Sequence, residues 1–593
     1  MQILIDNKES LQAILLCLVC CGVIAAAGRR SLCGSRLYLL MILACSSLIV
    51  FFRLGSFSFP HTTWQPESTG ASFILELPED THYDRIYAVY GEGDNNALDS
   101  GYQLGFHDIR LYGSNDLEHW EETAVLADTR IYRWSLTDTD RNDRYIKVCS
   151  EDPLDTISEL GFKAYGEDRF LPVRIHTDPQ EDSAYPAALV IDEQDSLCLH
   201  PDYRGESYFD EVYHVRNAWE IQASQRMYSH VHPLLGTGII AWSIRLFGMC
   251  PFAWRFPGAV CGILSLLVLY RILVILLRDR SDAALGTFFL SVDFMHMTAS
   301  RIATLEPFSI LFILCMFLFM IRYACADRGH TPLKDLLKHL FLSGLFTSLA
   351  IAVKWTGCYS AAGLAVIFFS CMIHDHHQLP EDDFRKLYRS IIPGCCVFFL
   401  VLPAVIYCIS YLPTTAFSDG WSLHNVLGQI RYCFHYHASL TAEHPYQSSW
   451  YEWLLDLRPV WYYVGHSGEE MRTIACFNNP VISIAGLACL LVCTKKAVIE
   501  KDWTSGLIAI GYWSALLPWL LVSRNTFAYH YYPSVLFLCM AMASVLSGHR
   551  TAKRIAAGAA LFLFCLYLPV ICGFASSASW LRFLEFLPGW YWG

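Results

Sequence analysis

The chain has 593 residues, of which 54% are hydrophobic, 14% aromatic and 17% charged. Soluble proteins carry about 25% charged residues, so this composition and a mean hydropathy of +0.33 indicate a polytopic membrane protein rather than a soluble one. The formal net charge of −12 argues against nucleic acid as a partner. The 23 cysteines lie mostly in apolar segments and include no pair of Cys-x-x-Cys motifs, so we predict no zinc site.

Residues 1–55 contain two apolar runs, 11–27 and 37–54, each of nearly spanning length. A short loop between them carries three arginines, and short basic loops face the cytoplasm. The first run is preceded by Asp6 and Glu9, whereas a signal peptide begins with basic residues. We therefore predict two retained transmembrane helices, with the first residue outside.

Residues 56–170 are predicted to form an extracellular β-sandwich. Short segments of alternating polarity, such as 73–77 and 85–90, are separated by turns rich in Gly, Asn and Asp. The segment 109–120, followed by 144–147, resembles the discoidin (coagulation-factor C-type) jelly roll. The resemblance implies loops that bind carbohydrate or lipid head groups, and a plain spacer above an active site is an equally good interpretation.

Residues 171–253 are predicted to be an extracellular loop that carries the acidic pair Asp210–Glu211 and then His232-Pro233. The apolar stretch 233–249 follows it and contains Arg245. If 254–277 crosses from outside to inside, five basic loops further along the chain all become cytoplasmic. The stretch 233–249 then cannot cross, and we predict an interfacial or re-entrant helix on the outer face.

Further spans are predicted within 254–412 and 480–593, which are joined by an extracellular loop over 413–479. Together with the N-terminal pair, the predicted fold is mainly α-helical and polytopic, with about twelve transmembrane helices. The spans are expected at 254–277, 283–301, 305–323, 339–355, 357–374, 391–412, 480–494, 504–523, 529–547 and 555–574. The polar residues between them gather on the outer face.

Several motifs occur in a fixed order along the chain: Phe209-Asp210-Glu211-Val212-Tyr213-His214, His232-Pro233-Leu234-Leu235-Gly236, Trp254-Arg255-Phe256-Pro257-Gly258, Ser300-Arg301 through Glu306, and Lys354-Trp355-Thr356-Gly357. This ordered set resembles the dolichyl-phosphate-mannose protein mannosyltransferases, in particular their bacterial relatives. Segments 436–463 and 529–533 extend the resemblance to roughly 205–550. It implies a GT-C fold and a polyprenyl-phosphate sugar donor.

The resemblance also implies roles for individual residues. Asp210 would be the catalytic base with Glu211 beside it, and Arg255 would bind the donor phosphate. Arg301 and Glu306 could form an ion pair that shapes the pocket. Substrate contacts are expected from His232, Arg301, Glu306, His444, Arg458 and His530. Mannose as the sugar, and a protein Ser/Thr hydroxyl or a glycan as the acceptor, come from the resemblance alone.

The sequence departs from the family pattern in three places, one of which is that two helices and a β domain precede the acidic loop where the family has one helix. His232-Pro233-Leu234-Leu235-Gly236-Thr237 lacks the lysine that usually ends this motif, and 413–479 is too short for the three-trefoil domain of eukaryotic members. The missing lysine leaves the donor head-group contacts open, and the missing trefoil domain together with the inserted β domain favours a bacterial plasma membrane. The distribution of basic loops places the site on the outside. No metal cluster is evident in the sequence, and a bound divalent cation is left open.

Other interpretations compete with this one. A lone Asp-Glu pair more often caps a helix N-terminus, and Arg255 could simply snorkel at the membrane interface. A polytopic transporter would place polar residues at mid-membrane and show internal repeats, which we do not find. A glycan-binding membrane protein without catalysis is the remaining alternative.

Overall fold

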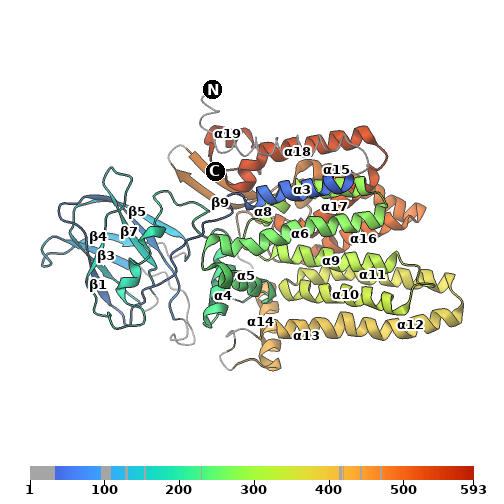
Figure 1. Ribbon diagram of the computed structural model, residues 1–593, viewed down its shortest axis with the longest axis horizontal. Helices are drawn as coiled ribbons and strands as arrows, with labels where there is room; N and C mark the ends of the chain where they lie inside the picture. The colour runs from blue at the N-terminus through green and yellow to red at the C-terminus, as the bar shows by residue number, and fades with distance from the viewer. Residues whose placement is uncertain are drawn as a thin grey trace. The chain divides into compact units, whose positions relative to one another are not determined.

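The computed structural model describes residues 34–94, 109–126, 131–152, 155–228, 230–412, 417, 420–440, 444–467 and 470–593, so the predicted span 11–27 lies outside the described residues (Figure 1). The chain divides into two compact units. Unit 1 comprises Met1–Leu54, Ser229–Ile240 and Arg255–Gly593, and unit 2 comprises Gly55–Tyr228 and Ala241–Trp254.

Unit 2 is built around two antiparallel sheets, which confirms the predicted β structure in the N-terminal part of the chain. One sheet has five strands in the order β4-β3-β6-β1-β8, and the other has three in the order β5-β2-β7. The strands are β1 (Ser72–Glu76), β2 (Tyr83–Val89), β3 (Ile109–Ser114), β4 (Glu121–Leu126), β5 (Trp134–Arg141), β6 (Tyr145–Cys149), β7 (Glu159–Ala164) and β8 (Arg174–Thr177). The relation to discoidin domains stays a prediction.

The register of these strands gives each sheet a buried apolar face. Leu75 of β1 lies opposite Ile146 of β6, and Ile86 of β2 lies opposite Phe162 of β7. All four side chains are fully buried, as the alternation of apolar and polar residues predicted. Beyond β8 the chain is irregular, with short turns η2 (Ala187–Val190) and η3 (Gln194–Ser196), until helix α4 (Glu211–Ala223) begins.

Unit 1 is mainly helical in the described part of the chain. Within the described part of the chain, eight helices are long and apolar enough to cross a membrane. They are α6 (Pro251–Leu277), α9 (Glu306–Ala324), α10 (Leu333–Val353), α11 (Thr356–Gln378), α12 with η4 and α13 (Glu381–Cys396, Val397–Val401, Leu402–Ile409), α15 with η6 (Pro480–Lys495, Lys496–Glu500), α16 with η7 (Trp503–Leu516, Leu517–Leu521), and α18 (Arg550–Cys572). The chain is therefore an integral multi-pass membrane protein. The predicted count of about twelve spans stays a prediction.

Several helices in the described regions are not among these eight. Helix α5 (Leu235–Phe247) has 13 residues, about 20 Å of helix, against a hydrocarbon core of about 30 Å. The others are α3 (Gly34–Phe51), α7 (Arg280–Ser291), α8 (Phe294–Ala299), α14 (Leu423–Ser439), α17 (Tyr532–Val545) and α19 (Ala578–Phe583), with the turns η5 (Trp453–Leu455) and η8 (Ala528–Tyr531). Helix α17 packs against α7, α15 and α16 and is almost wholly buried.

The structure differs from the predicted elements in two places. The span expected at 283–301 is divided into α7 and α8, because the Asp293 side chain accepts a hydrogen bond from the backbone N–H of His296 and so caps a new helix. The loop expected over 413–479 contains α14 and the hairpin β9 (Val460–Ser467) and β10 (Glu470–Cys476), which β11 (Ser576–Ser577) extends to three strands.

Candidate functional site

The acidic pair lies at the start of helix α4 in unit 2. Asp210 occupies the N-cap position, yet its side chain accepts no capping hydrogen bond, and it is half-buried. Glu211 is fully buried and accepts a hydrogen bond from the backbone N–H of Tyr208 at 3.1 Å. Phe209, just before the pair, has φ +52°, a left-handed conformation that is uncommon for a bulky residue. A helix-capping role, the competing interpretation, therefore does not account for the side chain of Asp210. The carboxylate of Glu211 stabilises the turn through its hydrogen bond to the backbone.

The segment that leads into this turn is hydrogen-bonded to the β domain. The carboxylate of Glu206 accepts a hydrogen bond from the backbone N–H of Trp134 at 3.1 Å. The backbone N–H of Ser207 donates to the carbonyl oxygen of Tyr132 at 2.7 Å. Because β5 begins at Trp134, these bonds tie the segment just before Asp210 to the edge of the three-stranded sheet.

A buried charge cluster holds the middle of α4. Arg216 forms ion pairs with Glu92, from the loop after β2, and with Glu220, one turn further along α4. Its guanidinium lies 4.0 Å from the centre of the Tyr228 ring, a cation–π geometry. All three charged side chains are almost wholly buried. Burial raises the pKa of Glu220, and the charge of Arg216 opposes that shift.

Two predicted site arginines lie buried in unit 1, at the carbonyl end of α3. Arg255 is fully buried and donates from Nη1 to the carbonyl oxygen of Leu54 at 2.9 Å. Arg301 donates from Nη1 to the carbonyl oxygens of Ile49 and Val50, both at 2.7 Å. A guanidinium can satisfy carbonyls that a helix end leaves without intrahelical partners. These contacts give both arginines a structural role, and their predicted contacts with substrate stay predictions.

Glu306 and His530 line one small cavity of about 20 Å³ together with Lys354 and Tyr529. Glu306, the first residue of α9, pairs with the Nζ of Lys354 at 2.5 Å, and that Nζ lies 5.4 Å from the centre of the Tyr529 ring. The backbone N–H of Phe527 donates to the Nδ1 of His530 at 3.0 Å. The predicted pairing of Glu306 with Arg301 stays a prediction, and Lys354 is a partner that the predicted site residues did not include.

His232 lies beside a second histidine that the predicted site also did not include. Its ring centre is 5.2 Å from that of His437 in α14, which in turn lies 6.2 Å from the ring of Trp355. The Nε2 of His437 lies 3.0 Å from the carbonyl oxygen of Val231. Burial lowers the pKa of His437 to about 4, and the nearby charge of Arg524 contributes to the shift. His437 is therefore neutral at physiological pH.

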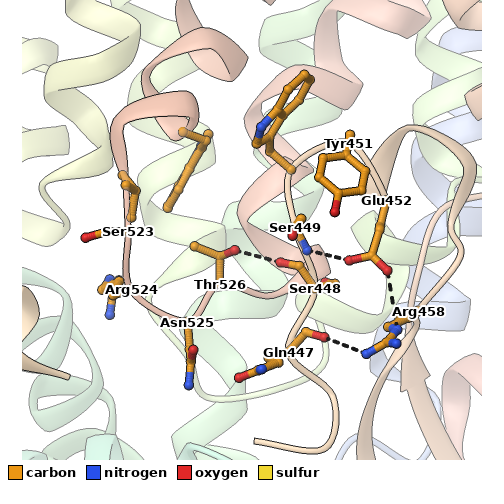
Figure 2. A pocket seen from close by; sticks show the side chains of 13 residues that line it. Gln447, Ser448, Ser449, Tyr451, Glu452, Arg458, Ser523, Arg524, Asn525 and Thr526 are labelled. Atoms are coloured by element: carbon orange, nitrogen blue, oxygen red, sulfur yellow. Dashed lines mark hydrogen bonds and ion pairs between the residues drawn. The ribbon is translucent and has the colours of Figure 1, made fainter. Parts of the chain in front are cut away.

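A larger pocket of about 420 Å³ opens between two loops of unit 1 (Figure 2). Its lining is mostly polar, with three aromatic rings: Gln447, Ser448, Ser449, Trp450, Tyr451, Glu452, Arg458, Trp519, Val522, Ser523, Arg524, Asn525 and Thr526. The predicted residue Arg458 lies in it and pairs with Glu452 at 3.3 Å. His444 is exposed and lies with its ring centre 5.1 Å from that of Phe527. Arg524 was missed because its loop carries no motif of its own.

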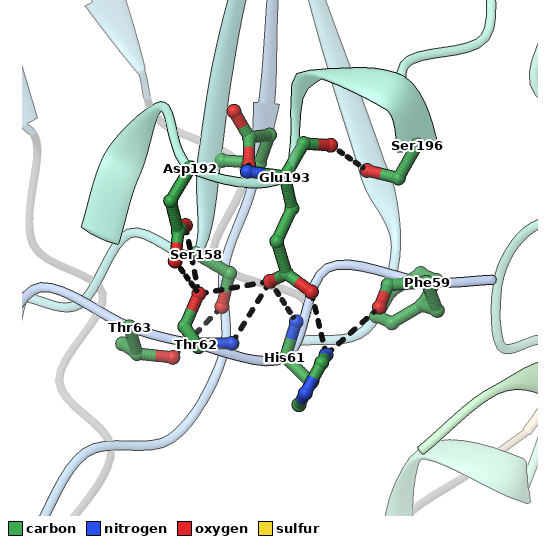
Figure 3. Close-up of polar contacts among 9 residues, drawn as sticks. Phe59, His61, Thr62, Thr63, Ser158, Asp192, Glu193 and Ser196 are labelled. Atoms are coloured by element: carbon green, nitrogen blue, oxygen red, sulfur yellow. Dashed lines mark hydrogen bonds and ion pairs between the residues drawn. The ribbon is translucent and has the colours of Figure 1, made fainter. Parts of the chain in front are cut away.

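One group of carboxylates in the described regions is close enough together to hold a metal ion, and Figure 3 shows two of its members, Asp192 and Glu193. It consists of Glu159, Asp192 and Glu193 in unit 2. Each is already engaged: Glu193 accepts hydrogen bonds from the backbone N–H groups of His61 and Thr62, Asp192 from the Thr62 hydroxyl, and Glu159 from the N–H of Glu193. Burial raises the pKa of Glu159 to about 8, which makes it a poor ligand at neutral pH. The cluster fits a structural junction between two segments.

Two family models match the chain. The one described as dolichyl-phosphate-mannose-protein mannosyltransferase matches residues 249–424. The one described as the C-terminal four-transmembrane region of protein-O-mannosyltransferase matches residues 423–591. Together they span more than half of the chain, and both begin after the acidic pair.

Characterised relatives and a solved structure agree with these models. The polyprenol-phosphate-mannose–protein mannosyltransferase of Mycolicibacterium smegmatis is 24% identical over 468 residues, covering 66% of this chain and 89% of the relative. The protein of the same description from Mycobacterium tuberculosis is 23% identical over 458 residues, covering 65% and 87%. The S. cerevisiae protein O-mannosyltransferase Pmt1–Pmt2 complex bound to the sugar donor matches with a TM-score of 0.57 at 12% identity, covering 65% of this chain and 89% of that one. The last similarity shows a shared fold, which is the GT-C fold predicted from the sequence.

Proposed function

Since the chain is a membrane glycosyltransferase of the protein O-mannosyltransferase family, we propose that it moves mannose from a polyprenyl-phosphate donor to a Ser/Thr hydroxyl of a protein. The donor and the class of acceptor are those that the names of its bacterial relatives state. A glycan hydroxyl is the alternative acceptor, because the β domain lies outside the residues that the family models match.

The geometry of the Asp210 turn supports this proposal. Its carboxylate stands at the start of α4, half-buried and without a capping hydrogen bond, while Glu211 behind it is buried and bonded to the backbone. A general base must be reachable by its substrate and held in place by its surroundings. Asp210 meets the first condition. The bonds of Glu206 and Ser207 to the β domain meet the second.

The proposed reaction is a single in-line displacement. Asp210 takes the proton of the acceptor hydroxyl, and the oxygen attacks the anomeric carbon. The bond between that carbon and the phosphate oxygen breaks, so the anomeric configuration inverts. The polyprenyl phosphate leaves as an anion, and because phosphate is a good leaving group the step needs no strong acid. A positioned base of this kind contributes about 10²–10⁴-fold to the rate.

The active site is proposed to face the outside of a bacterial plasma membrane. The five basic loops between the predicted spans support this orientation by the positive-inside rule. Arg255 is buried and donates to the carbonyl oxygen of Leu54, so its predicted contact with the donor phosphate stays a prediction.

Product analysis tests the proposed reaction. Membranes that contain the full chain are incubated with polyprenyl-phosphate mannose, glucose or arabinose and a Ser/Thr-rich peptide, and the product is identified by mass spectrometry. We expect a peptide heavier by one hexose with the mannosyl donor alone. A chain that transfers none of these sugars to the peptide would contradict the proposal.

A further inference from the structure

The pocket of Figure 2 contains an arginine whose charge is not balanced. Arg458 pairs with Glu452 on one wall, and Arg524 stands on the opposite wall without a salt bridge to any described residue. Two arginines against one glutamate leave the described lining with one net positive charge. A pocket of this kind favours a ligand that carries one negative charge.

The charge of Arg524 also acts on its neighbours. Burial lowers the pKa values of His437 and His530, and the charges of Lys354 and Arg524 lower both further. Both histidines are thereby kept neutral. Lys354 is already paired with Glu306, which leaves Arg524 as the available cation among the described residues of this part of unit 1.

The pocket lies where a membrane span ends. Residues 522–526, which form one wall, directly follow the span Trp503–Leu521. Leu520 and Leu521 at that end are 53% and 89% exposed. A charged pocket beside an exposed apolar helix end suits a ligand with an anionic head and a hydrocarbon tail.

We propose that this pocket holds the phosphate of the polyprenyl-phosphate substrate, with Arg524 as its principal contact. This assignment deepens the proposed function and rests on it. The planar guanidinium of Arg524 pairs with two phosphate oxygens, the Ser523 hydroxyl donates a further hydrogen bond, and the isoprenoid chain lies along Leu520 and Leu521. A phosphodiester carries one negative charge, which matches the charge of the lining.

Binding to the purified full chain tests the proposal. The probe is undecaprenyl phosphate, the lipid phosphate that leaves in the proposed reaction; it carries no sugar, so no turnover occurs. We expect Arg524→Gln to weaken binding about 10–100-fold, as loss of a charge-assisted contact does, and Arg524→Lys to weaken it less. Arg458→Gln should have a smaller effect than Arg524→Gln because Glu452 already balances its charge. Arg389→Gln, at an exposed position of α12 away from the pocket, is the matched control.

Further measurements distinguish a lipid phosphate from inorganic phosphate and from an acidic acceptor peptide as the ligand of the pocket. Leu521→Ser should weaken the binding of undecaprenyl phosphate but not that of inorganic phosphate, because only undecaprenyl phosphate has a hydrocarbon tail. If Arg524→Gln binds undecaprenyl phosphate as tightly as its parent, or if it instead raises the KM of an acidic acceptor peptide only, the assignment is wrong. Unchanged thermal unfolding of Arg524→Gln shows that a binding loss is not a folding loss.

The proposal and the proposed function fail in different ways. If Asp210→Asn retains full transfer activity while Arg524→Gln weakens binding, the base assignment is wrong and the pocket stands. If Asp210→Asn abolishes transfer and Arg524→Gln leaves the donor KM unchanged, the pocket assignment alone is wrong.

Discussion

Glu206 accepts a hydrogen bond from the backbone N–H of Trp134 at 3.1 Å, and so joins the segment four residues before Asp210 to strand β5. The inserted β domain is therefore connected to the proposed catalytic turn by a specific contact between residues 72 apart in the sequence. We expect the domain to help hold this turn whether or not it binds a ligand.

Removal of that contact should reduce catalysis. In Glu206→Ala the buried N–H of Trp134 loses its acceptor, which costs about 1–3 kcal/mol and loosens the turn that positions Asp210. We expect a fall in kcat that exceeds any rise in donor KM, while the protein remains folded. Glu206→Gln, which keeps an acceptor oxygen, should restore most of the rate. Equal activity of Glu206→Ala and wild type at saturating donor would show that the contact does not position the base.

The buried ion pair of Glu92 with Arg216 should stabilise α4. In Glu92→Gln the buried charge of Arg216 loses the opposite charge of Glu92 and keeps that of Glu220, so we expect a loss of roughly 1.5–3 kcal/mol in the free energy of unfolding. Denaturant unfolding of the full chain, monitored by tryptophan fluorescence, measures it. Glu118→Gln, at an exposed position of the same unit, is the control and should change stability by less than about 0.5 kcal/mol. Equal losses in the two variants would contradict the role of the buried pair.

Glu159 should make the β domain less stable as the pH rises. Its pKa in the folded state is about 8, raised mainly by burial, against an ordinary value of 4.5. Below pH 4.5 the carboxyl is protonated in both states. Between pH 4.5 and 8 the unfolded chain releases the proton while the folded chain keeps it, so stability falls, by at most about 5 kcal/mol once the pH passes 8.

Glu159→Gln cannot ionise and should lack this loss. The thermal unfolding midpoint of the full chain is compared between wild type and variant at pH 5 and pH 8. We expect the variant to gain relative to wild type between the two pH values. A difference that stays constant would show that Glu159 is already ionised in the folded protein at pH 5.

Lys354 and Glu306 should be energetically coupled. Each side chain is only 11–13% exposed in their ion pair, so Lys354→Met leaves Glu306 without its partner, and Glu306→Gln does the converse. We expect each single variant to lose more stability than half of the double variant's loss, with a coupling energy of about 0.5–3 kcal/mol. A double-mutant cycle on thermal unfolding measures it. Additive losses would show that the pair contributes no net interaction.

The sequence predicted the long apolar helices well. Helix α9 runs Glu306–Ala324 where 305–323 was expected, because charged residues bound an unbroken apolar run. The division between α7 and α8 was missed because it depends on Asp293, whose second oxygen accepts from the backbone N–H of Asn479, 186 residues away. The hydrophobic periodicity of the sequence gives no information about a contact between residues so far apart in the chain.

The site was predicted only in part, because some of it also depends on contacts between segments that are distant in the sequence. Motifs pointed to Glu306 and His530, and the structure brings these two together around Lys354. Arg524 was missed because the pocket is made by two loops, 447–458 and 519–526, that are remote in sequence and carry common polar residues. A local pattern identifies residues of unusual chemistry, and it does not show which loops meet.

Substitution of Asp210 tests the central claim most directly. Transfer of mannose from polyprenyl-phosphate mannose to a peptide is measured with wild type, Asp210→Asn and the control Asp182→Asn, an exposed aspartate of the same unit, at equal amounts of folded protein. We predict that Asp210→Asn loses at least about 100-fold in kcat, while Asp182→Asn matches wild type. An Asp210→Asn protein that transfers mannose at the wild-type rate would show that Asp210 is not the base.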